Sequence, residues 1–354
     1  MRHQGRPWLT RGLSLALLAA LIGLLSACGG DATAGSANYG GSLNHLHDLL
    51  VVRGAPHTVL LASHIGLYRT SNDGASWTEV AGGSGQAMDG LMLYKLAQSP
   101  VDAQRLYVLA IPRPDNPKAA RAAPGIYTSA DAGRSWALAS ALTAFPASGV
   151  YSIGTGAASP GQVFAVIPSL GAAGLYASTD AGSHWHALPT LPTSDPSGVL
   201  GDPGHAQHLY LWSVSGGLFT SADDGAHWTP AVGTSGGIFA LSIAGRMIYA
   251  SGGAGLYVST DGGDTFHLTD AADTFSAVVA APSAPTHAYA LTGTTAFASM
   301  DGGATWRPTA TTSRHPNVLG VDSASATTAY VGFSYPIGVA LTTNSGTNWS
   351  ALLG

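Results

Sequence analysis

Short segments of alternating apolar and polar residues recur along the chain from about residue 44 onward. In "GLYVS", Leu256 and Val258 would lie on one face of an extended segment, and Tyr257 and Ser259 on the other. Similar apolar runs precede each such segment, as in "HLYLWS" and "GIFALSI", and a shorter one follows, as in "WHAL". This order predicts units of four short strands in an all-β protein.

An eight-residue motif separates the third and fourth predicted strands of each unit. It has the form S/T-x-D/N-x-G-x-x-W/F and begins at Thr70, Ser129, Ser178, Ser221, Ser259, Ser299 and Thr342. Four-stranded units repeating roughly every 40 residues are typical of propeller blades. We therefore expect a seven-bladed β-propeller of four-stranded antiparallel blades over residues 44–354. Because blades one and seven each have four strands of their own, the ring should close without exchanging a strand.

The seven octets resemble the Asp-box (BNR) repeat of sialidases, sortilin-type receptors, some glucanases and photosystem II assembly factors. The resemblance implies one Asp-box per blade, with a structural role. Asp and Asn at the third position can accept hydrogen bonds from the loop backbone, and the glycine can adopt positive φ. Two copies carry asparagine, which would fail as a catalytic carboxylate. The structural positions are Asn72, Asp131, Asp180, Asp223, Asp261, Asp301 and Asn344.

The first 43 residues have the pattern of a lipoprotein leader and tether. Three arginines precede an apolar run, Leu13 to Leu25, that is short for a bilayer span. "LSAC" then resembles a bacterial lipobox, so we expect a signal peptide over 1–27 and lipidation of Cys28, the single cysteine. A plain secretory signal is the alternative. Residues 28–43 are expected to be a flexible Gly/Ser-rich tether. The protein would then be an extracytoplasmic, membrane-anchored lipoprotein of the cell envelope.

The charge of the chain argues against nucleic-acid binding. It has 14 Lys and Arg against 19 Asp and Glu, and three of the arginines lie in the predicted leader. A processed chain would have a net charge of about −8, whereas nucleic-acid binding needs a basic face. We expect a monomer with a protein or glycan partner.

Unusual side chains collect on the face opposite the octets, in blades seven, one and two. This face receives the loops between second and third strands and the connections between blades. The candidate residues for partner binding are His45, His47, His64, Met88, Asp89, Met92, Arg113, Lys118, Arg121, Arg314, His315 and Tyr335.

Three of these residues could form a metal site. His45 and His47 are two apart at the start of the innermost strand of blade one, and His64 lies in a loop at the same end. Imidazoles bind zinc and copper, and Met88 or Met92 would favour copper(I). The alternative is that the histidines are polar residues of the channel, hydrogen-bonded to neighbouring loops.

The sequence favours a binding or assembly module over an enzyme. The segment beyond the predicted leader has a single glutamate, Glu79, in a predicted outer strand, and no F/Y-R-I-P motif precedes the first octet. Both features argue against a sialidase. The alternative function is a sialidase-like glycoside hydrolase acting on extracellular glycans through two carboxylates, from Asp48, Asp89 and Asp115, although no pair has an evident spacing.

Overall fold

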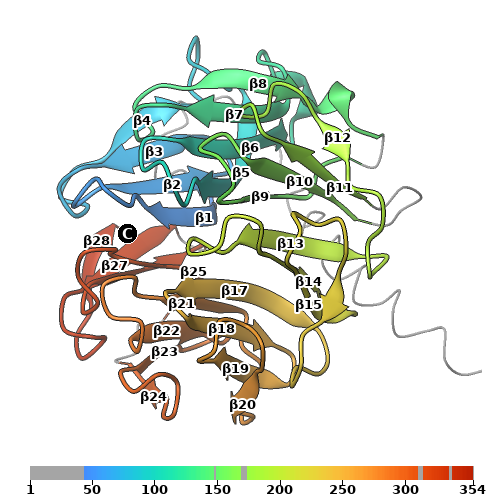
Figure 1. The fold of residues 1–354 in the computed structure, drawn as a ribbon. Helices are drawn as coiled ribbons and strands as arrows, with labels where there is room; N and C mark the ends of the chain where they lie inside the picture. The colour runs from blue at the N-terminus through green and yellow to red at the C-terminus, as the bar shows by residue number, and fades with distance from the viewer. Residues whose placement is uncertain (1–43, 147–148, 169–173, 310–313, 335–336, 354) are drawn as a thin grey trace, which may run out of the picture.

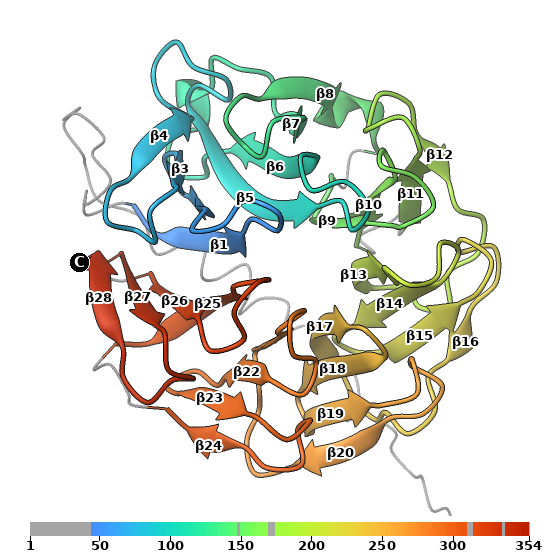
Figure 2. The same ribbon diagram turned by 60° about the vertical axis from the view of Figure 1, so that its left-hand side comes forward.

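The computed structural model describes residues 44–146, 149–168, 174–309, 314–334 and 337–353. They form seven four-stranded antiparallel sheets, arranged as the blades of a ring (Figures 1 and 2). This confirms the predicted seven-bladed propeller. The predicted leader, Cys28 and the tether lie outside the described residues. No helix of the described part is long and apolar enough to cross a membrane.

Each blade consists of four strands that are consecutive in sequence. Those of blades one to three are β1 (Leu46–Val51), β2 (Val59–Ser63), β3 (Leu67–Thr70), β4 (Thr78–Ala81), β5 (Leu91–Gln98), β6 (Leu106–Pro112), β7 (Gly125–Ser129), β8 (Ala137–Ala141), β9 (Ser152–Thr155), β10 (Val163–Ile167), β11 (Gly174–Ser178) and β12 (His186–Ala187). Two 3-10 helices, η1 (Pro117–Ala119) and η2 (Leu142–Ala144), flank β7 and β8.

Blades four to seven repeat this order. Their strands are β13 (Pro196–Gly201), β14 (Leu209–Ser213), β15 (Gly217–Ser221), β16 (Thr229–Pro230), β17 (Ile238–Ala244), β18 (Met247–Gly252), β19 (Gly255–Ser259), β20 (His267–Asp270), β21 (Ala277–Ala280), β22 (Ala288–Leu291), β23 (Ala296–Ser299), β24 (Arg307–Pro308), β25 (Pro316–Val321), β26 (Ala329–Phe333), β27 (Gly338–Thr342) and β28 (Ser350–Leu353).

The hydrophobic core lies between the blades. Second strands such as β2 and β10 are buried along their whole length, whereas the fourth strands are largely exposed. Every apolar cluster joins residues of two adjacent blades; Leu60 and Leu93, for example, belong to the cluster between blades one and two. A single sheet could not bury both of its faces alone, so the ring is what removes this apolar surface from water.

The ring closes as predicted, by packing of blade seven against blade one. The inner strands β1 and β25 are in contact, and no strand is shared between the two sheets (Figure 2). Val318 and Tyr330 share an apolar cluster with Leu46 and Leu61 across this seam. Asn317 Nδ2 also donates a hydrogen bond to the Leu46 carbonyl, at 3.0 Å.

Tyrosines of the second strands link one blade to the next. The buried Tyr210, Tyr249 and Tyr289 donate hydrogen bonds of 2.7–2.8 Å to backbone carbonyls of the following blade. Tyr330 of blade seven instead donates to the Asp73 carboxylate of blade one, at 2.5 Å. The series therefore continues through the seam, where it uses a charged acceptor.

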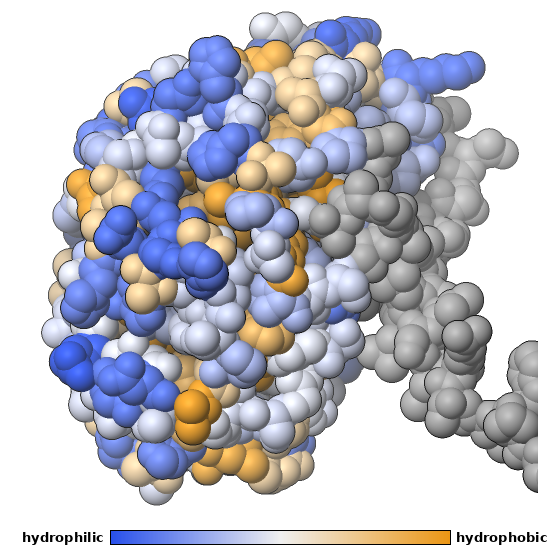
Figure 3. Space-filling view, turned by 45° about the vertical axis from the view of Figure 1, so that its right-hand side comes forward, coloured by the Kyte–Doolittle hydropathy of each residue, from blue (hydrophilic) through white to orange (hydrophobic). Residues whose placement is uncertain are grey.

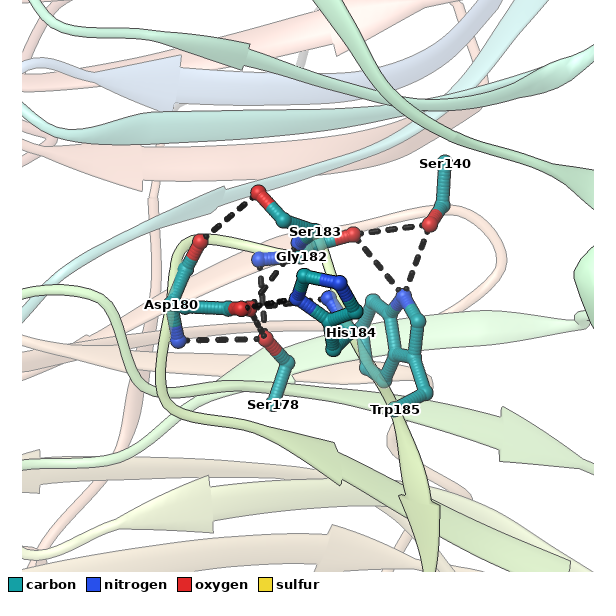
Figure 4. A network of polar contacts seen from close by, with 7 residues as sticks. All are labelled: Ser140, Ser178, Asp180, Gly182, Ser183, His184 and Trp185. Carbon is teal, nitrogen blue, oxygen red and sulfur yellow. Dashed lines mark hydrogen bonds and ion pairs between the residues drawn. The ribbon is translucent and has the colours of Figure 1, made fainter.

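The octet loops repeat one hydrogen-bond network in all seven blades. In the copy shown in Figure 4, Ser178 Oγ donates to Asp180 Oδ1 at 2.8 Å and accepts from the Gly182 N–H at 2.9 Å. Asp180 Oδ1 also accepts from the His184 N–H at 2.9 Å. The Asn72 and Asn344 copies make the same three contacts, two of them to the amide oxygen and the third from the glycine N–H to the threonine hydroxyl. The network therefore needs an acceptor oxygen at the third position, and a charge is dispensable there.

Two consecutive residues of each octet have positive φ. The glycine does so at Gly182, with φ of 89°, and a Cβ there would lie 3.2 Å from Ala139 of the preceding blade. The residue before it also has positive φ, and in five copies this residue is not glycine, as at Ala132 and Ala181. The motif predicts positive φ at its glycine, because a glycine is present there in all seven copies. It does not predict positive φ at the preceding residue, whose identity varies.

Candidate metal centre

The three candidate histidines meet at the end of blade one that lies opposite its octet loop. His45 directly precedes β1, and His64 directly follows β2, whose last residue pairs with the first of β1. His47 lies where the register of β1 shifts, between the pairs Leu46–Ser63 and Asp48–Ala62. It is therefore a bulge residue. The inner strands of blades two, four, five and seven have the same register shift, so the bulge belongs to the repeat, and in blade one it sets the direction of the His47 side chain.

The imidazole rings are close enough to share a ligand. The ring centroid of His45 is 4.5 Å from that of His47 and 4.7 Å from that of His64, onto which it stacks. The three candidate ligand nitrogens lie within 4.8 Å of one another. His64 is buried, and His45 and His47 are half-buried. The site is thus a partly enclosed set of three nitrogen donors.

Asp115 fixes the protonation state of His64. Its Oδ1 lies 2.6 Å from His64 Nε2, and its Oδ2 accepts from Arg113 Nη2 at 2.8 Å. An ionised carboxylate accepts hydrogen bonds, so His64 carries its proton on Nε2. The buried Nδ1 of His64 has no hydrogen-bond partner among the described residues, and neither has Nε2 of His47. These two ring nitrogens are left without a protein partner among the described residues.

Burial keeps His47 and His64 neutral. Burial, together with the neighbouring His45 and His64, lowers the pKa of His47 to about 3. Burial also lowers the pKa of His64, although Asp115 opposes this shift. Burial would raise the pKa of Asp115, but hydrogen bonds from Arg113 and His64 hold it at about 2. Neutral imidazoles beside an ionised carboxylate are the state in which histidines bind metals.

An aromatic row extends from this cluster along the inner strands, and the sequence reading missed it. Tyr94 occupies the bulge of β5 that corresponds to His47, and its ring centroid lies 5.4 Å from that of His47. Tyr151, just before β9, lies 6.2 Å from Tyr94. Burial raises the pKa of Tyr94, as does its hydrogen bond with Tyr151. The sequence signal was a polar-tipped aromatic within an otherwise apolar inner strand, "LMLYKLA".

The predicted sulfur ligands occupy apolar surroundings. Met88 is fully buried in the apolar cluster between blades one and two, where it adopts a φ of 61°. Met92 is fully buried within β5. The structure thus surrounds Met88 with aliphatic side chains, and imidazole nitrogens remain as the donors of the cluster.

Asp89 joins two loops beside the cluster. Its carboxylate accepts from the Gly85 N–H at 2.8 Å and lies 3.6 Å from Arg121 Nη1. Its backbone carbonyl accepts from the N–H groups of Arg121 and Ala122. Residues 82–90 and 113–124, the two loops that bear five of the twelve candidate partner-binding residues, are therefore fixed to each other.

The predicted basic residues are partly neutralised. Arg113 is paired with Asp115, whereas Lys118 in η1 and Arg121 are exposed. In blade seven, the Arg314 guanidinium lies 4.9 Å above the Phe333 ring, and His315 is exposed with Nδ1 3.1 Å from the Gly293 carbonyl. Tyr335 lies outside the described residues. Two exposed cationic side chains on blade two, Lys118 and the Asp89-paired Arg121, are thus what the described residues contribute to the expected basic patch.

Each carboxylate weighed for glycoside hydrolysis has a partner of its own. Asp48 Oδ2 lies 3.1 Å from Lys95 Nζ and accepts from the Leu96 N–H. Asp89 faces Arg121, and Asp115 faces Arg113 and His64. A general acid needs a raised pKa, whereas that of Asp115 is lowered. The arrangement suits structural and positioning roles.

Comparison with known proteins supports the fold. No protein-family model matches the chain, and no curated protein matches it. Among solved structures, a GH74 xyloglucanase from Xanthomonas campestris covers 88% of this chain at 18% identity with a TM-score of 0.69. YCF48 from Cyanidioschyzon merolae covers 85% at 17% identity with a TM-score of 0.59.

These neighbours differ in how much of their own length is matched. This chain spans 55% of the xyloglucanase and 96% of YCF48. A second YCF48 structure, described as bound to a D1 peptide, covers 75% of this chain at 12% identity with a TM-score of 0.54. At such identities the likeness shows the propeller fold alone.

Proposed function

We propose that the protein is a lipid-anchored, extracytoplasmic propeller that binds a protein or glycan partner without chemically changing it. The binding surface is the face opposite the octet loops, over blades one and two. The observation that carries the proposal is the joining of loops 82–90 and 113–124 through Asp89, which holds the exposed Lys118 and Arg121 beside the histidine cluster. A fixed pair of loops reduces the conformational entropy that a binding surface loses on association.

The chemistry of this surface favours a polar partner. Its exposed side chains Lys118 and Arg121 are cationic, and the nearby carboxylates are paired, Asp115 with Arg113 and Asp89 with Arg121. The exposed large apolar residues of the described chain are single residues on other elements, such as Val101 and Leu268. On the side shown in Figure 3, apolar residues are likewise interspersed with hydrophilic ones. An anionic protein segment or an acidic glycan would complement Lys118 and Arg121.

The similar solved structures include a precedent for a binding module and a precedent for a glycoside hydrolase. YCF48 matches this chain over nearly its whole length and has been solved with a bound peptide, which favours a binding module. The GH74 enzymes, of which this chain covers 55% and 48% of the length, keep a glycoside hydrolase as the second candidate.

Site-specific crosslinking tests the binding surface. A photoreactive residue placed at Arg121 should give a discrete adduct in native membranes, whereas one placed at His227, in an octet loop on the other face, should give none. The adduct should bind again as a purified component, and Lys118→Glu with Arg121→Glu should weaken that binding at least tenfold. Equal adducts from both positions would contradict the surface assignment.

Assays with fluorogenic glycosides and a glycan array test the second candidate. A binding module should retain glycans, if these are its partner, without releasing fluorophore. Turnover that disappears in Asp48→Asn or Asp89→Asn would replace the binding proposal with hydrolysis.

A further inference from the structure

The histidine cluster of blade one contains unused donor atoms that the binding proposal does not require. His64 Nδ1 and His47 Nε2 are buried and without hydrogen-bond partners among the described residues. A buried polar atom without a hydrogen-bond partner destabilises the folded state, because its lost hydration is not replaced. Two such atoms, held beside a third imidazole, are best explained by a ligand that the protein binds there.

From this geometry we infer that His45, His47 and His64 bind one divalent transition-metal ion of the zinc–copper class. All three side chains are nitrogen donors, and their candidate ligand atoms lie within 4.8 Å of one another. A tetrahedral ion with bonds of 2.0–2.1 Å holds its donor nitrogens ~3.4 Å apart. Small rotations of half-buried side chains would therefore complete the site.

Asp115 is the outer-shell residue of this site. It accepts the Nε2 proton of His64 and is itself held by Arg113. A carboxylate behind a ligating histidine selects the tautomer and increases the basicity of the other nitrogen. The chain Arg113–Asp115–His64 runs from the β6–β7 loop of blade two into blade one, so it also fixes the ring relative to the neighbouring blade.

The donor set restricts the metal. Imidazole suits Zn²⁺ and Cu²⁺, whereas Cu⁺ prefers sulfur, and Met88 is fully buried in the apolar cluster between blades one and two. Three protein ligands leave at least one coordination position for water or an exogenous donor. The row of Tyr94 and Tyr151 begins 5.4 Å from His47 and would border that position.

Metal analysis of the full chain, purified without a histidine tag, tests the site. After EDTA treatment and dialysis, titration with ZnCl₂ and with CuCl₂ in separate calorimetric experiments should give one equivalent in at least one arm. Cu²⁺ should give an electron paramagnetic resonance spectrum with nitrogen coupling. His47→Ala should abolish stoichiometric binding, and Asp115→Asn should weaken it about 10- to 100-fold.

The controls separate this site from adventitious binding. His184→Ala and His227→Ala remove exposed histidines that are paired with octet aspartates, and both variants should keep the equivalent of metal. Near-ultraviolet circular dichroism shows whether each variant is folded, and His47→Ala, at a half-buried bulge position, is the substitution that perturbs packing least. No stoichiometric binding in either titration, or unchanged binding by folded His47→Ala, would overturn the proposal. Partner capture by the exposed cations does not depend on the metal, so either proposal can fail alone.

Discussion

At the scale of single residues, the octets show which chemistry is required and which is exchangeable. The hydroxyl at the first position donates to the Asp or Asn oxygen and accepts from the glycine N–H in all seven copies, as between Thr342, Asn344 and Gly346. This much could be read from the sequence, because the residue types recur at fixed offsets. The positive φ of Ala132 and Ala181 could not, since nothing about alanine indicates that conformation.

The octet aspartates make the free energy of unfolding depend on pH in the acidic range. Burial would raise the pKa of Asp131, but hydrogen bonds from Ser135, Ser129 and the Arg134 N–H hold it at about 2. The ionised form therefore stabilises the fold above the pKa of the unfolded chain, and this contribution is lost as the pH falls through about 2.

Asp131→Asn should reduce that dependence. Asparagine keeps the acceptor oxygen, as Asn72 does, but binds no proton in this range. We expect less than about 1 kcal/mol of change at pH 7, because the site is exposed and screened, and a smaller loss of unfolding free energy between pH 4 and pH 2. Urea unfolding at several pH values measures both. An unchanged acid profile would contradict the assignment.

Tryptophan indoles reveal a second residue-scale rule. Trp185 Nε1 donates to Ser140 Oγ, and Trp349 Nε1 to Thr309 Oγ1, each on the preceding blade. Trp136 Nε1 is buried without a partner among the described residues. In blade five, Thr269 lies at the bulge of the fourth strand and its Oγ1 accepts from Trp306 Nε1 of the next blade; the residue at the same bulge of blade one, which precedes Trp136, is Val80.

Val80→Thr should therefore supply the missing acceptor. Threonine has nearly the shape of valine, and we expect a gain of roughly 1 kcal/mol in unfolding free energy. Ser140→Ala, which removes one of the two acceptors of Trp185 and the hydroxyl that donates to the Gly182 carbonyl, should lose a similar amount. Chemical denaturation of both variants provides the comparison, and destabilisation by Val80→Thr would contradict the rule.

At the scale of elements, strand order was predictable and strand irregularity was not. Alternation and spacing predict four strands per blade, and they place His45, His47 and His64 at one end of blade one. They do not show the bulges at His47 and Tyr94, because a bulge depends on pairing between strands. The partner of His64 was also hidden, since Asp115 lies 51 residues away in a loop whose path is set by Asp89.

The junction of the two loops predicts unequal effects at Asp89 and Arg121. Asp89→Ala removes a largely buried acceptor of the Gly85 N–H, and we expect a loss of about 1–2 kcal/mol. The Arg121 side chain is 72% exposed, so Arg121→Ala should change unfolding free energy by less than about 0.5 kcal/mol. Equal losses in urea unfolding would contradict this account of the junction.

At the scale of the whole molecule, the closed ring combines seven similar interfaces. Repetition of the octet predicted the number of blades, and the presence of four strands in the first and last units predicted the type of closure. The tyrosine hydrogen bonds between blades could not be predicted in the same way, because a tyrosine in an apolar strand indicates only a core residue and does not show which group its hydroxyl contacts. Tyr330 differs from its equivalents, since its acceptor is the Asp73 carboxylate.

Tyr330→Phe should weaken the seam more than Tyr289→Phe weakens the junction of blades six and seven. Loss of the only charged acceptor in the series should cost roughly 1.5–3 kcal/mol, against about 1 kcal/mol for the bond to the Ala326 carbonyl. Limited proteolysis and thermal unfolding of the two variants would measure the difference, and equal midpoints would refute it.

Closure without an exchanged strand makes the boundary between β28 and β1 equivalent in kind to the six other boundaries. Each blade begins and ends within itself, so the polypeptide can in principle be opened at any connection between blades. Circular permutants that join residue 353 to residue 44 by a short Gly/Ser linker and begin instead at Ile238, the first residue of blade five, should fold to the same ring. The fold of the ring therefore does not require the propeller to be opened at the boundary between blade seven and blade one.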